Sequence, residues 1–235
     1  AENPLPERFR GLPILDASRC PEGCSACAEA CPTGAITLEG GLRLDLGKCT
    51  FCPVCVESCP SGAMTFSRDY RLAATRRESL VLTNSERPKV EALGKEMLRL
   101  FGRSLKLRQV SAGGCAGCEA DLNVLGTVIF DLGRFGIQFV ASPRHADGIV
   151  VTGPVTTNMV SALRDTYEAT PAPKIVIAVG ACAISGGPFA GADACALGVP
   201  ADLPVDLYVP GCPPHPLTLL DGLLGLLGRI EKPAP

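Results

Sequence analysis

Tryptophan is absent from the 235-residue chain, and aromatic residues make up only 5% of it. The formal net charge is −2, so the sequence offers no excess of positive charge for nucleic acid, and no nucleic-acid partner is expected. No apolar run approaches the length that spans a membrane, and the longest candidate, 217–227, is interrupted by polar residues and glycine. Because no basic start precedes an apolar core, we also expect no signal peptide.

The motifs of common enzyme classes are missing too. The chain has no phosphate loop of the form G-x₄-G-K-[ST], no dinucleotide motif G-x-G-x-x-G and no Ser/His/Asp arrangement. Cysteine, in contrast, is abundant, with 13 residues. The chemistry of the chain is therefore expected to come from its thiols.

Eight of these cysteines fall into two near-identical runs. The runs read Cys20-Pro-Glu-Gly-Cys24-Ser-Ala-Cys27-Ala-Glu-Ala-Cys31-Pro32 and Cys49-Thr-Phe-Cys52-Pro-Val-Cys55-Val-Glu-Ser-Cys59-Pro60. The second matches the C-x₂-C-x₂-C-x₃-C-P pattern of bacterial iron–sulfur proteins, and the first has one extra residue between its first two cysteines. This pattern predicts two [4Fe–4S] clusters and one-electron transfer.

In two-cluster proteins the fourth cysteine of each run ligates the other cluster. The predicted ligand sets are Cys20, Cys24, Cys27 and Cys59 for the first cluster, and Cys49, Cys52, Cys55 and Cys31 for the second. Zinc sites or disulfides are the alternatives, but two runs of four cysteines ending in Cys-Pro are not zinc spacing, and disulfides would need an oxidising compartment. The repeat resembles the bacterial two-cluster ferredoxin over about residues 12–70, which implies an α+β ferredoxin-like domain with two cubane clusters.

The rest of the chain has the pattern of an α/β domain. Charged residues over 68–87 indicate a linker, and apolar residues at helical spacing after Pro88 predict an amphipathic helix whose apolar face packs on the core. Short apolar segments then alternate with helical ones, which favours a mainly parallel sheet covered on both faces. The expected strands are 105–110, 136–141, 148–151, 174–179 and 205–209, and the expected helices are 119–132, 156–169 and 217–230.

Four further cysteines follow three of these strands: Cys115 and Cys118 follow the first, Cys182 the fourth and Cys212 the last. Ligands of parallel sheets sit beyond the carboxyl ends of the strands, and the neighbouring glycines let the backbone approach a bulky group. A third [4Fe–4S] cluster is one interpretation of this set. Plain core cysteines are the other.

Several segments together resemble the small subunit of membrane-bound, group 4 [NiFe] hydrogenases, in particular that of formate hydrogenlyase, and the wider complex I 20-kDa subunit superfamily. They are Gly-Gly-Cys-Ala-Gly-Cys-Glu at 113–119, Ser-Pro-Arg-His-Ala-Asp at 142–147, Val-Thr-Gly-Pro at 151–154, Gly-Ala-Cys at 180–182, Ser-Gly-Gly at 185–187 and Val-Pro-Gly-Cys-Pro-Pro at 209–214. The resemblance covers about 88–230 and implies a flavodoxin-like fold, a third [4Fe–4S] cluster on the four cysteines above, and a large-subunit partner. Complex I relatives place two cysteines side by side where this chain has Cys115-x-x-Cys118.

Four other residues are candidates for minor functions. Glu119 follows a predicted ligand and could add favourable charge at a helix start or take part in a proton relay. His215 could donate a hydrogen bond to a cluster sulfur and act as a second-shell cofactor-binding residue, whereas His145 is expected to be structural. Cys195 exceeds the need of three clusters and is interpreted as a buried or loop thiol.

The sequence thus predicts a ferredoxin domain at 1–75, a linker with an amphipathic helix at 76–104 and a hydrogenase small-subunit-like domain at 105–235. The expected function is electron relay in a hydrogenase-like oxidoreductase complex, with the catalytic metal on the large subunit, membrane subunits reached through the complex and an upstream electron donor. The complex is expected at the cytoplasmic side of the cell membrane, with this chain peripheral. Two alternatives stay open: a complex I-like, quinone-linked complex without nickel, and a free-standing iron–sulfur carrier.

Overall fold

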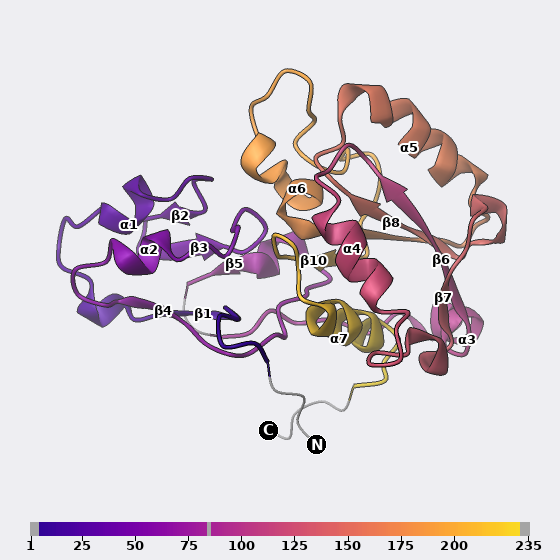
Figure 1. The fold of residues 1–235 in the computed structure, drawn as a ribbon, viewed down its shortest axis with the longest axis horizontal. Coiled ribbons are helices and arrows are strands. Elements are labelled where there is room, and N and C mark those ends of the chain that lie inside the picture. The colour runs from indigo at the N-terminus through magenta and orange to yellow at the C-terminus, as the bar shows by residue number, and fades with distance from the viewer. Residues whose placement is uncertain (1–4, 84–85, 231–235) are drawn as a thin grey trace.

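The computed structural model describes residues 5–83 and 86–230. The outer ends of the two predicted domains, 1–4 and 231–235, and the linker residues 84–85 lie outside the described residues. The chain forms two lobes that lie side by side, with the first third of the sequence in the smaller one (Figure 1). Within the described part, no helix combines the length and the apolar character that crossing a membrane requires.

The N-terminal lobe repeats one small unit twice. Its strands are β1 (Pro13–Leu15), β2 (Ile36–Thr37), β3 (Arg43–Asp45), β4 (Met64–Phe66) and β5 (Val81–Leu82), its helices α1 (Ala26–Glu29) and α2 (Val54–Glu57), and 3-10 turns occupy Ala17–Arg19 and Arg77–Leu80. Strand β1 pairs antiparallel with β4, and β3 lies between β2 and β5 in a second antiparallel sheet. Each short helix carries the third cysteine of one run, so the internal repeat of the sequence is also a repeat of structure.

Strand β5 comes from the segment that the sequence indicates as a linker. Leu80 and Leu82 are buried in the same core as Leu44, and β5 continues the sheet through β3. The start of the linker therefore packs on the N-terminal lobe, and a domain boundary at residue 75 stays a prediction.

The C-terminal lobe contains the five predicted strands and the three predicted helices, which all begin within about two residues of the expected positions. The strands are β6 (Leu105–Ser111), β7 (Ile137–Phe139), β8 (Gly148–Thr152), β9 (Ile175–Val179) and β10 (Leu207–Val209), the helices α3 (Lys95–Phe101), α4 (Gly117–Val124), α5 (Thr157–Ala169), α6 (Gly180–Ser185) and α7 (Pro216–Leu226), and 3-10 turns occupy Leu132–Phe135, Pro143–His145 and Gly187–Phe189. All pairings in this sheet are parallel, in the spatial order β10-β9-β8-β6-β7.

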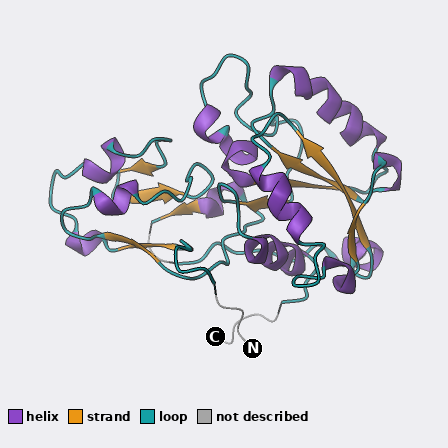
Figure 2. Cartoon of the chain, viewed as in Figure 1, coloured by secondary structure: helices purple, strands orange, loops and turns teal. Residues whose placement is uncertain are grey.

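The sheet is covered on both faces, as its continuous apolar strands predict (Figure 2). Val150 and Ile177 belong to the core shared with α3, α4 and α7. Their neighbours Ile149 and Val176 belong to the core on the other face, where Leu163 of α5 packs. Alternate side chains of one strand thus fill two different cores, and the carboxyl ends of the strands are left to carry loops.

The prediction that a helix begins at Pro88 is wrong, since α3 begins only at Lys95. Residues 88–94 instead run in irregular conformation, held by hydrogen bonds from Thr75 N to Lys89 O (3.3 Å) and from Leu93 N to Leu226 O (2.9 Å). The expected core packing is confirmed for Val90, Leu93, Met97 and Phe101, whereas Leu100 of the same stripe is 52% exposed. Helices α4 and α7 are shorter than expected: α4 ends at Val124 rather than at 132, and α7 at Leu226 rather than at 230. The end of α7 is followed by Gly228, which takes a positive φ of 65°.

The two lobes pack against each other over a shared core. Ala183 and Ile184 of α6 are buried together with apolar residues of the N-terminal lobe. Ser185 donates a hydrogen bond from its hydroxyl to the carbonyl of Gly47 (2.8 Å), and Ala74 exchanges two backbone bonds with Tyr208 of β10 (3.0 and 2.8 Å). These contacts fix the loops of the first lobe next to the carboxyl ends of the second lobe's sheet.

Candidate functional site

The second predicted set of thiols lies around one small cavity. Cys31, Cys49, Cys52 and Cys55 all line it. Burial, together with repulsion from other thiols of the set, raises the pKa of Cys49 to about 12 and that of Cys55 to about 11. The structure therefore brings Cys31 out of its own run and into the group formed by the other run.

The reciprocal exchange is found in the first set. Burial is the main cause that raises the pKa of Cys27, and repulsion from Cys59 and then Cys20 adds to it. Of the thiols outside the first run, Cys59 therefore affects Cys27 most, in line with the predicted exchange. Cys24 follows the turn at Gly23 and is half-buried, but it is not among the main causes of the Cys27 shift.

Backbone amides point at the crossing cysteines in the same way in both repeats. Ala35 N donates to Cys31 Sγ (3.3 Å), and Ala63 N donates to Cys59 Sγ (3.2 Å). Phe51 N makes a third such bond, to Cys49 Sγ (3.3 Å). Donors of this kind stabilise thiolate charge and are one means by which proteins set the reduction potential of an iron–sulfur cluster.

The third predicted set assembles at the carboxyl edge of the parallel sheet. Cys115 and Cys118 follow β6, Cys182 lies in α6 after β9, and Cys212 follows β10. Burial raises the pKa of Cys118, repulsion from Glu119 is the next cause, and the three other thiols add to it. Burial and then repulsion from Cys212 and Cys115 raise the pKa of Cys182 to about 11. Cys115 and Cys212 are exposed, so this set opens to the surface.

Glycine makes room at this edge. Gly180 has a φ of 87°, and a Cβ atom there would lie 2.6 Å from the sulfur of Cys118. Gly187 is similarly tight, with a Cβ position 3.1 Å from the sulfur of Cys182. A side chain at either position would push into the space that the thiols enclose.

Each of the three predicted sets offers four thiols, the number that a cubane takes. Within residues 5–83 and 86–230 no three His, Cys, Asp or Glu side chains converge closely enough to hold one metal ion. The four thiolates of a cubane lie farther apart than the ligands of a single ion, because each binds a different iron. Crowded thiols with raised pKa also need a positive group before they can deprotonate, and iron supplies that charge.

The second set adjoins both of the others. Cys27 of the first set also raises the pKa of Cys55 in the second. Cys52 of the second set raises the pKa of Cys212 in the third, after burial and Cys115. Since Cys52 and Cys212 come from different lobes, this pair marks the point where the lobes bring two thiol sets together.

The other sequence candidates have defined surroundings. Glu119 accepts hydrogen bonds from the hydroxyls of Ser111 and Thr152, both at 2.6 Å, and these outweigh the effect of burial and hold its pKa below the ordinary value. Its position in the first turn of α4 agrees with the helix-start interpretation. The proton-relay interpretation stays a prediction.

The two histidines have different surroundings. His215 accepts a hydrogen bond at Nδ1 from Leu217 N (3.1 Å) and so caps α7, and burial lowers its pKa. Among the described residues its recorded partners do not include a cysteine sulfur, and its expected donation to a cluster stays a prediction. His145 is exposed on a 3-10 turn.

Cys195 lies near the third set without being one of the four. It is a minor contributor to the raised pKa of Cys182, and its backbone forms a bridge with Thr156. It is neither exposed nor fully buried, as expected for a loop thiol.

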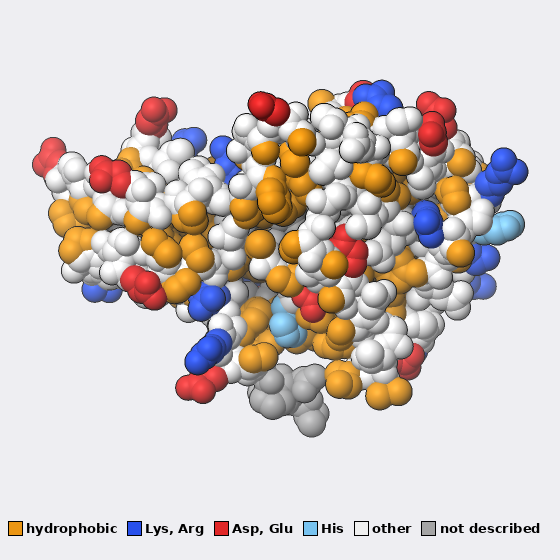
Figure 3. Space-filling view, turned by 45° about the horizontal axis from the view of Figure 1, so that its top comes forward, with side chains coloured by type: hydrophobic (Ala, Val, Ile, Leu, Met, Phe, Trp, Pro, Cys, Tyr) orange, Lys and Arg blue, Asp and Glu red, His pale blue; other side chains and the backbone are white. Residues whose placement is uncertain are grey.

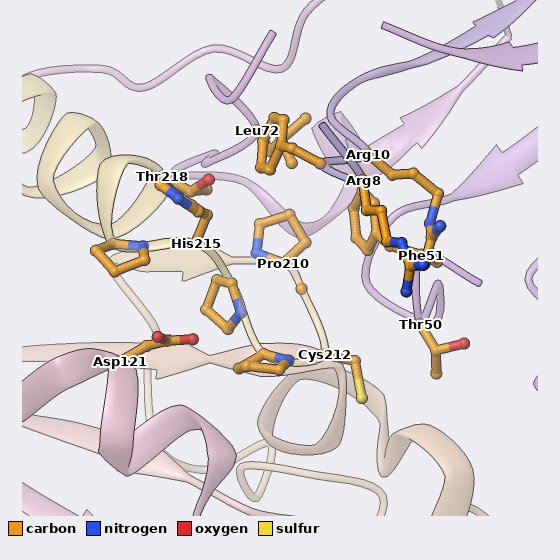
Figure 4. Close-up of a pocket in the computed structure, with 15 residues that line it drawn as sticks. Arg8, Arg10, Thr50, Phe51, Leu72, Asp121, Pro210, Cys212, His215 and Thr218 are labelled. Carbon is orange, nitrogen blue, oxygen red and sulfur yellow. The ribbon is translucent and has the colours of Figure 1, made fainter. Parts of the chain in front are cut away.

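A cavity of about 250 Å³ at the junction of the lobes has no counterpart in the sequence motifs (Figure 4). Arg8 and Arg10 approach it from one side, His215 and Thr218 from the other, and Cys212 lies at its edge. Motif analysis missed these arginines because their segment precedes the first cysteine run and contains no repeated pattern.

Comparison with known proteins finds one matching family for each of the two lobes. The profile of the NADH ubiquinone oxidoreductase 20-kDa subunit family matches residues 115–226, and that of the 4Fe-4S dicluster domain matches residues 19–63. The probable membrane-bound hydrogenase subunit mbhJ of Pyrococcus furiosus is 40% identical over 149 residues, which are 63% of this chain and 89% of that protein.

Two further curated relatives and one solved structure are similar. An NADH-quinone oxidoreductase subunit of Heliobacterium modesticaldum is 47% identical over 52% of this chain and 71% of its own length. Formate hydrogenlyase subunit 7 of Escherichia coli is 40% identical over 61% of this chain and 56% of its own length. A chain in the membrane-bound sulfane sulfur reductase, an archaeal respiratory membrane complex, is 34% identical with a TM-score of 0.50, over 58% of this chain and 75% of that one.

The predicted function is confirmed in its general form: the chain is an iron–sulfur electron-transfer subunit of a membrane-associated oxidoreductase complex. It belongs to the family of complex I 20-kDa subunits and [NiFe] hydrogenase small subunits, and carries a 4Fe-4S dicluster domain ahead of that module.

Proposed function

We propose that the chain holds three [4Fe–4S] clusters and passes electrons one at a time along them. The proposed ligands are Cys20, Cys24, Cys27 and Cys59 for the first cluster, Cys49, Cys52, Cys55 and Cys31 for the second, and Cys115, Cys118, Cys182 and Cys212 for the third. Bound clusters supply the redox chemistry. The chain's residues hold the thiolates, direct amide N–H groups at them and limit the access of water.

One observation carries this proposal: Cys31, Cys49, Cys52 and Cys55 line one cavity, so the thiols of the two runs are grouped as cluster ligation across the repeat requires. This second set adjoins the first at Cys27 and Cys55 and the third at Cys52 and Cys212. The second cluster would then be the middle station of the relay. The strand order of the C-terminal sheet also supports the third site, because it is the 2-1-3-4-5 order of flavodoxin-like domains, in which ligands bind at the carboxyl edge.

We propose that the third cluster faces a large subunit. Cys115 and Cys212 are exposed, which suits a cluster that must approach a redox centre on another chain. Exposed apolar side chains follow α6 on this edge: Phe189 and Leu197 are 42% and 69% exposed. Figure 3 shows hydrophobic side chains gathered in the middle of the face that it presents. A free-standing carrier has no use for such a surface.

The large subunit decides the reaction at the end of the relay. The spacing Cys115-x-x-Cys118 favours a hydrogenase-like partner with a nickel–iron site, in line with the relatives from the membrane-bound hydrogenase and formate hydrogenlyase. The quinone-linked alternative is favoured by the similarity to the NADH-quinone oxidoreductase relative. In either case we propose a peripheral position at the cytoplasmic side of the membrane, with membrane subunits and an electron donor in the same complex.

Iron and sulfide analysis of the anaerobically purified chain, combined with electron paramagnetic resonance (EPR), tests the proposal. Three cubanes predict about twelve irons and twelve sulfides per chain, with magnetic interaction between reduced clusters. About eight irons with an intact ferredoxin half would remove the third cluster. Crosslinking in the native complex checks the partner, and an edge around Cys115 open to solvent there would favour the free carrier.

A further inference from the structure

The segment ahead of β1 spans the junction of the two lobes. We name residues 6–10 the N-terminal strap. The strap leaves the N-terminal lobe at Gly11, whose N–H donates to Ser67 O (2.9 Å) and whose Cβ position would lie 2.3 Å from Asp69 O. It is therefore anchored firmly at one end, next to the β1–β4 sheet.

Two contacts of the strap touch the loops that carry the facing thiols. Arg10 donates from Nε to the carbonyl of Phe51 (2.6 Å), and Phe51 stands between Cys49 and Cys52. The ring of Phe9 meets the ring of His215 edge to face, with centroids 5.1 Å apart and an interplanar angle of 72°. Neighbouring strap residues thus hold one loop of each lobe.

The loop contacted by Phe9 has its own fixed geometry. His215 accepts a hydrogen bond from Leu217 N and begins α7, so its ring has a defined orientation at the end of the loop that contains Cys212. A contact on this ring is therefore transmitted to the loop. An edge-to-face pair of rings is attracted beyond what its buried area gives, which favours one position of the loop.

The strap also brings positive charge. The guanidinium groups of Arg8 and Arg10 line the junction cavity beside Thr50, Phe51 and Cys212 (Figure 4). Neither arginine forms an ion pair within residues 5–83 and 86–230. Asp121 is the acidic residue of the cavity lining, and burial raises its pKa.

We propose that the N-terminal strap positions and tunes the electron step between the second and third clusters, with Phe9 fixing the Cys212 loop against the N-terminal lobe and Arg8 and Arg10 stabilising the added electron. This inference rests on the proposed function. In the step one cluster loses one electron and the other gains it, and no bond forms or breaks. Positive charge near a cluster raises its reduction potential, because reduction adds negative charge.

The strap is not what holds the lobes together. The shared core with Ala183 and Ile184, the Ser185–Gly47 hydrogen bond and the Ala74–Tyr208 bridge already do so. Variants of the strap should therefore keep the fold and the iron, which makes a specific effect on the redox step measurable.

The experiment uses the full chain with its clusters. Phe9→Ala removes the ring contact without a change of charge, Arg10→Gln and Arg8→Gln each remove a charge, and Arg10→Lys restores the charge on the strap. Arg164→Gln is the matched control, because Arg164 pairs with Asp202 on the exposed side of α5, away from the thiols. The readouts are EPR-monitored redox titration, the magnetic interaction between the second and third clusters, and hydrogen exchange of residues 211–218.

Phe9→Ala is expected to weaken or change the magnetic interaction and to speed exchange in residues 211–218, with potentials unchanged. Arg10→Gln and Arg8→Gln are expected to lower the potential of the second or third cluster, and Arg10→Lys to return it toward the parent value. If Arg10→Gln loses iron, Arg8→Gln decides the charge effect, since its side chain forms no hydrogen bond within the described residues. Potentials, coupling and exchange equal to those of the parent and of Arg164→Gln in all strap variants would overturn the inference. A parent chain without three interacting clusters would instead overturn the proposed function.

Discussion

Gly180 approaches Cys118 so closely that a methyl group on its α-carbon would lie 2.6 Å from the cysteine sulfur. Gly180→Ala is therefore expected to displace Cys118 and to lower the iron content by about four per chain, while the ferredoxin clusters remain. Gly191→Ala is a matched control, because Gly191 has nearly the same φ, 88° against 87°, but nothing lies within 4 Å of its Cβ position. Both variants carry the backbone cost of a positive φ, about 1 kcal/mol. Equal iron contents in the two would show that the contact with Cys118 is irrelevant.

The exchange of cysteines between the two runs predicts which cluster each variant damages. Cys31→Ser is expected to impair the cluster held by Cys49, Cys52 and Cys55, because Cys31 lines their cavity. Cys59→Ser is its symmetric counterpart and should impair the cluster of Cys20 and Cys27. The EPR signals of the two variants should be complementary. Loss of the same signal in both would contradict the exchange.

The ion pair between Arg77 and Asp45 holds the start of the linker segment on the N-terminal lobe. Arg77 donates to both carboxylate oxygens, at 2.6 and 2.8 Å, and both side chains are largely buried. Arg77→Met is expected to lower the free energy of unfolding by about 1–3 kcal/mol, or the apparent Tm by several degrees.

Arg76→Met supplies the comparison for that measurement. Arg76 pairs with Glu91 at 3.4 Å with both side chains more than 60% exposed, so its loss should cost less than about 1 kcal/mol. Thermal unfolding followed by circular dichroism in the same buffer checks both variants. A larger effect at Arg76 than at Arg77 would mean that the buried pair does not anchor this segment.

The sequence could predict which thiols are grouped because ligand spacing is a local property of the chain; their ligation of clusters stays a prediction. The runs around Cys27 and Cys55 carry their geometry in a few residues, and apolar strands followed by cysteine predict which ends meet. The start of α3 was not predictable in the same way. The apolar stripe of residues 90–101 has helical spacing, but hydrogen bonds to Thr75 and Leu226, distant in sequence, decide the conformation of its first half.

The junction between the lobes was not predictable at all. Phe9 and Arg10 belong to no motif, and their partners His215 and Phe51 lie far away in the sequence. Asp121 likewise belongs to a cavity that exists only after the lobes have packed. Sequence patterns report what each segment does with its neighbours along the chain, whereas this cavity depends on contacts between lobes.

Asp221 on α7 predicts the pH dependence of stability. Burial raises its pKa to about 6, against an ordinary value of 3.8; Arg71 and Arg87 act in the opposite direction, and Asp69 adds to the rise. Because the folded chain then binds this proton more tightly than the unfolded chain, Asp221 favours folding at low pH. Its contribution is lost as the pH rises from about 4 to about 6.

Asp221→Asn removes the charge and keeps the shape of the side chain, so it is expected to be more stable than the parent at pH 7. After allowance for partial exposure and screening, the gain should be about 1–2 kcal/mol, and it should shrink toward zero near pH 4. The apparent Tm of both proteins between pH 4 and 8 measures this difference. Asp202→Asn is the control, because Asp202 is an exposed partner of Arg164 and should show no gain that grows with pH. A difference between Asp221→Asn and the parent that stays constant across this range would show that Asp221 titrates normally in the folded chain.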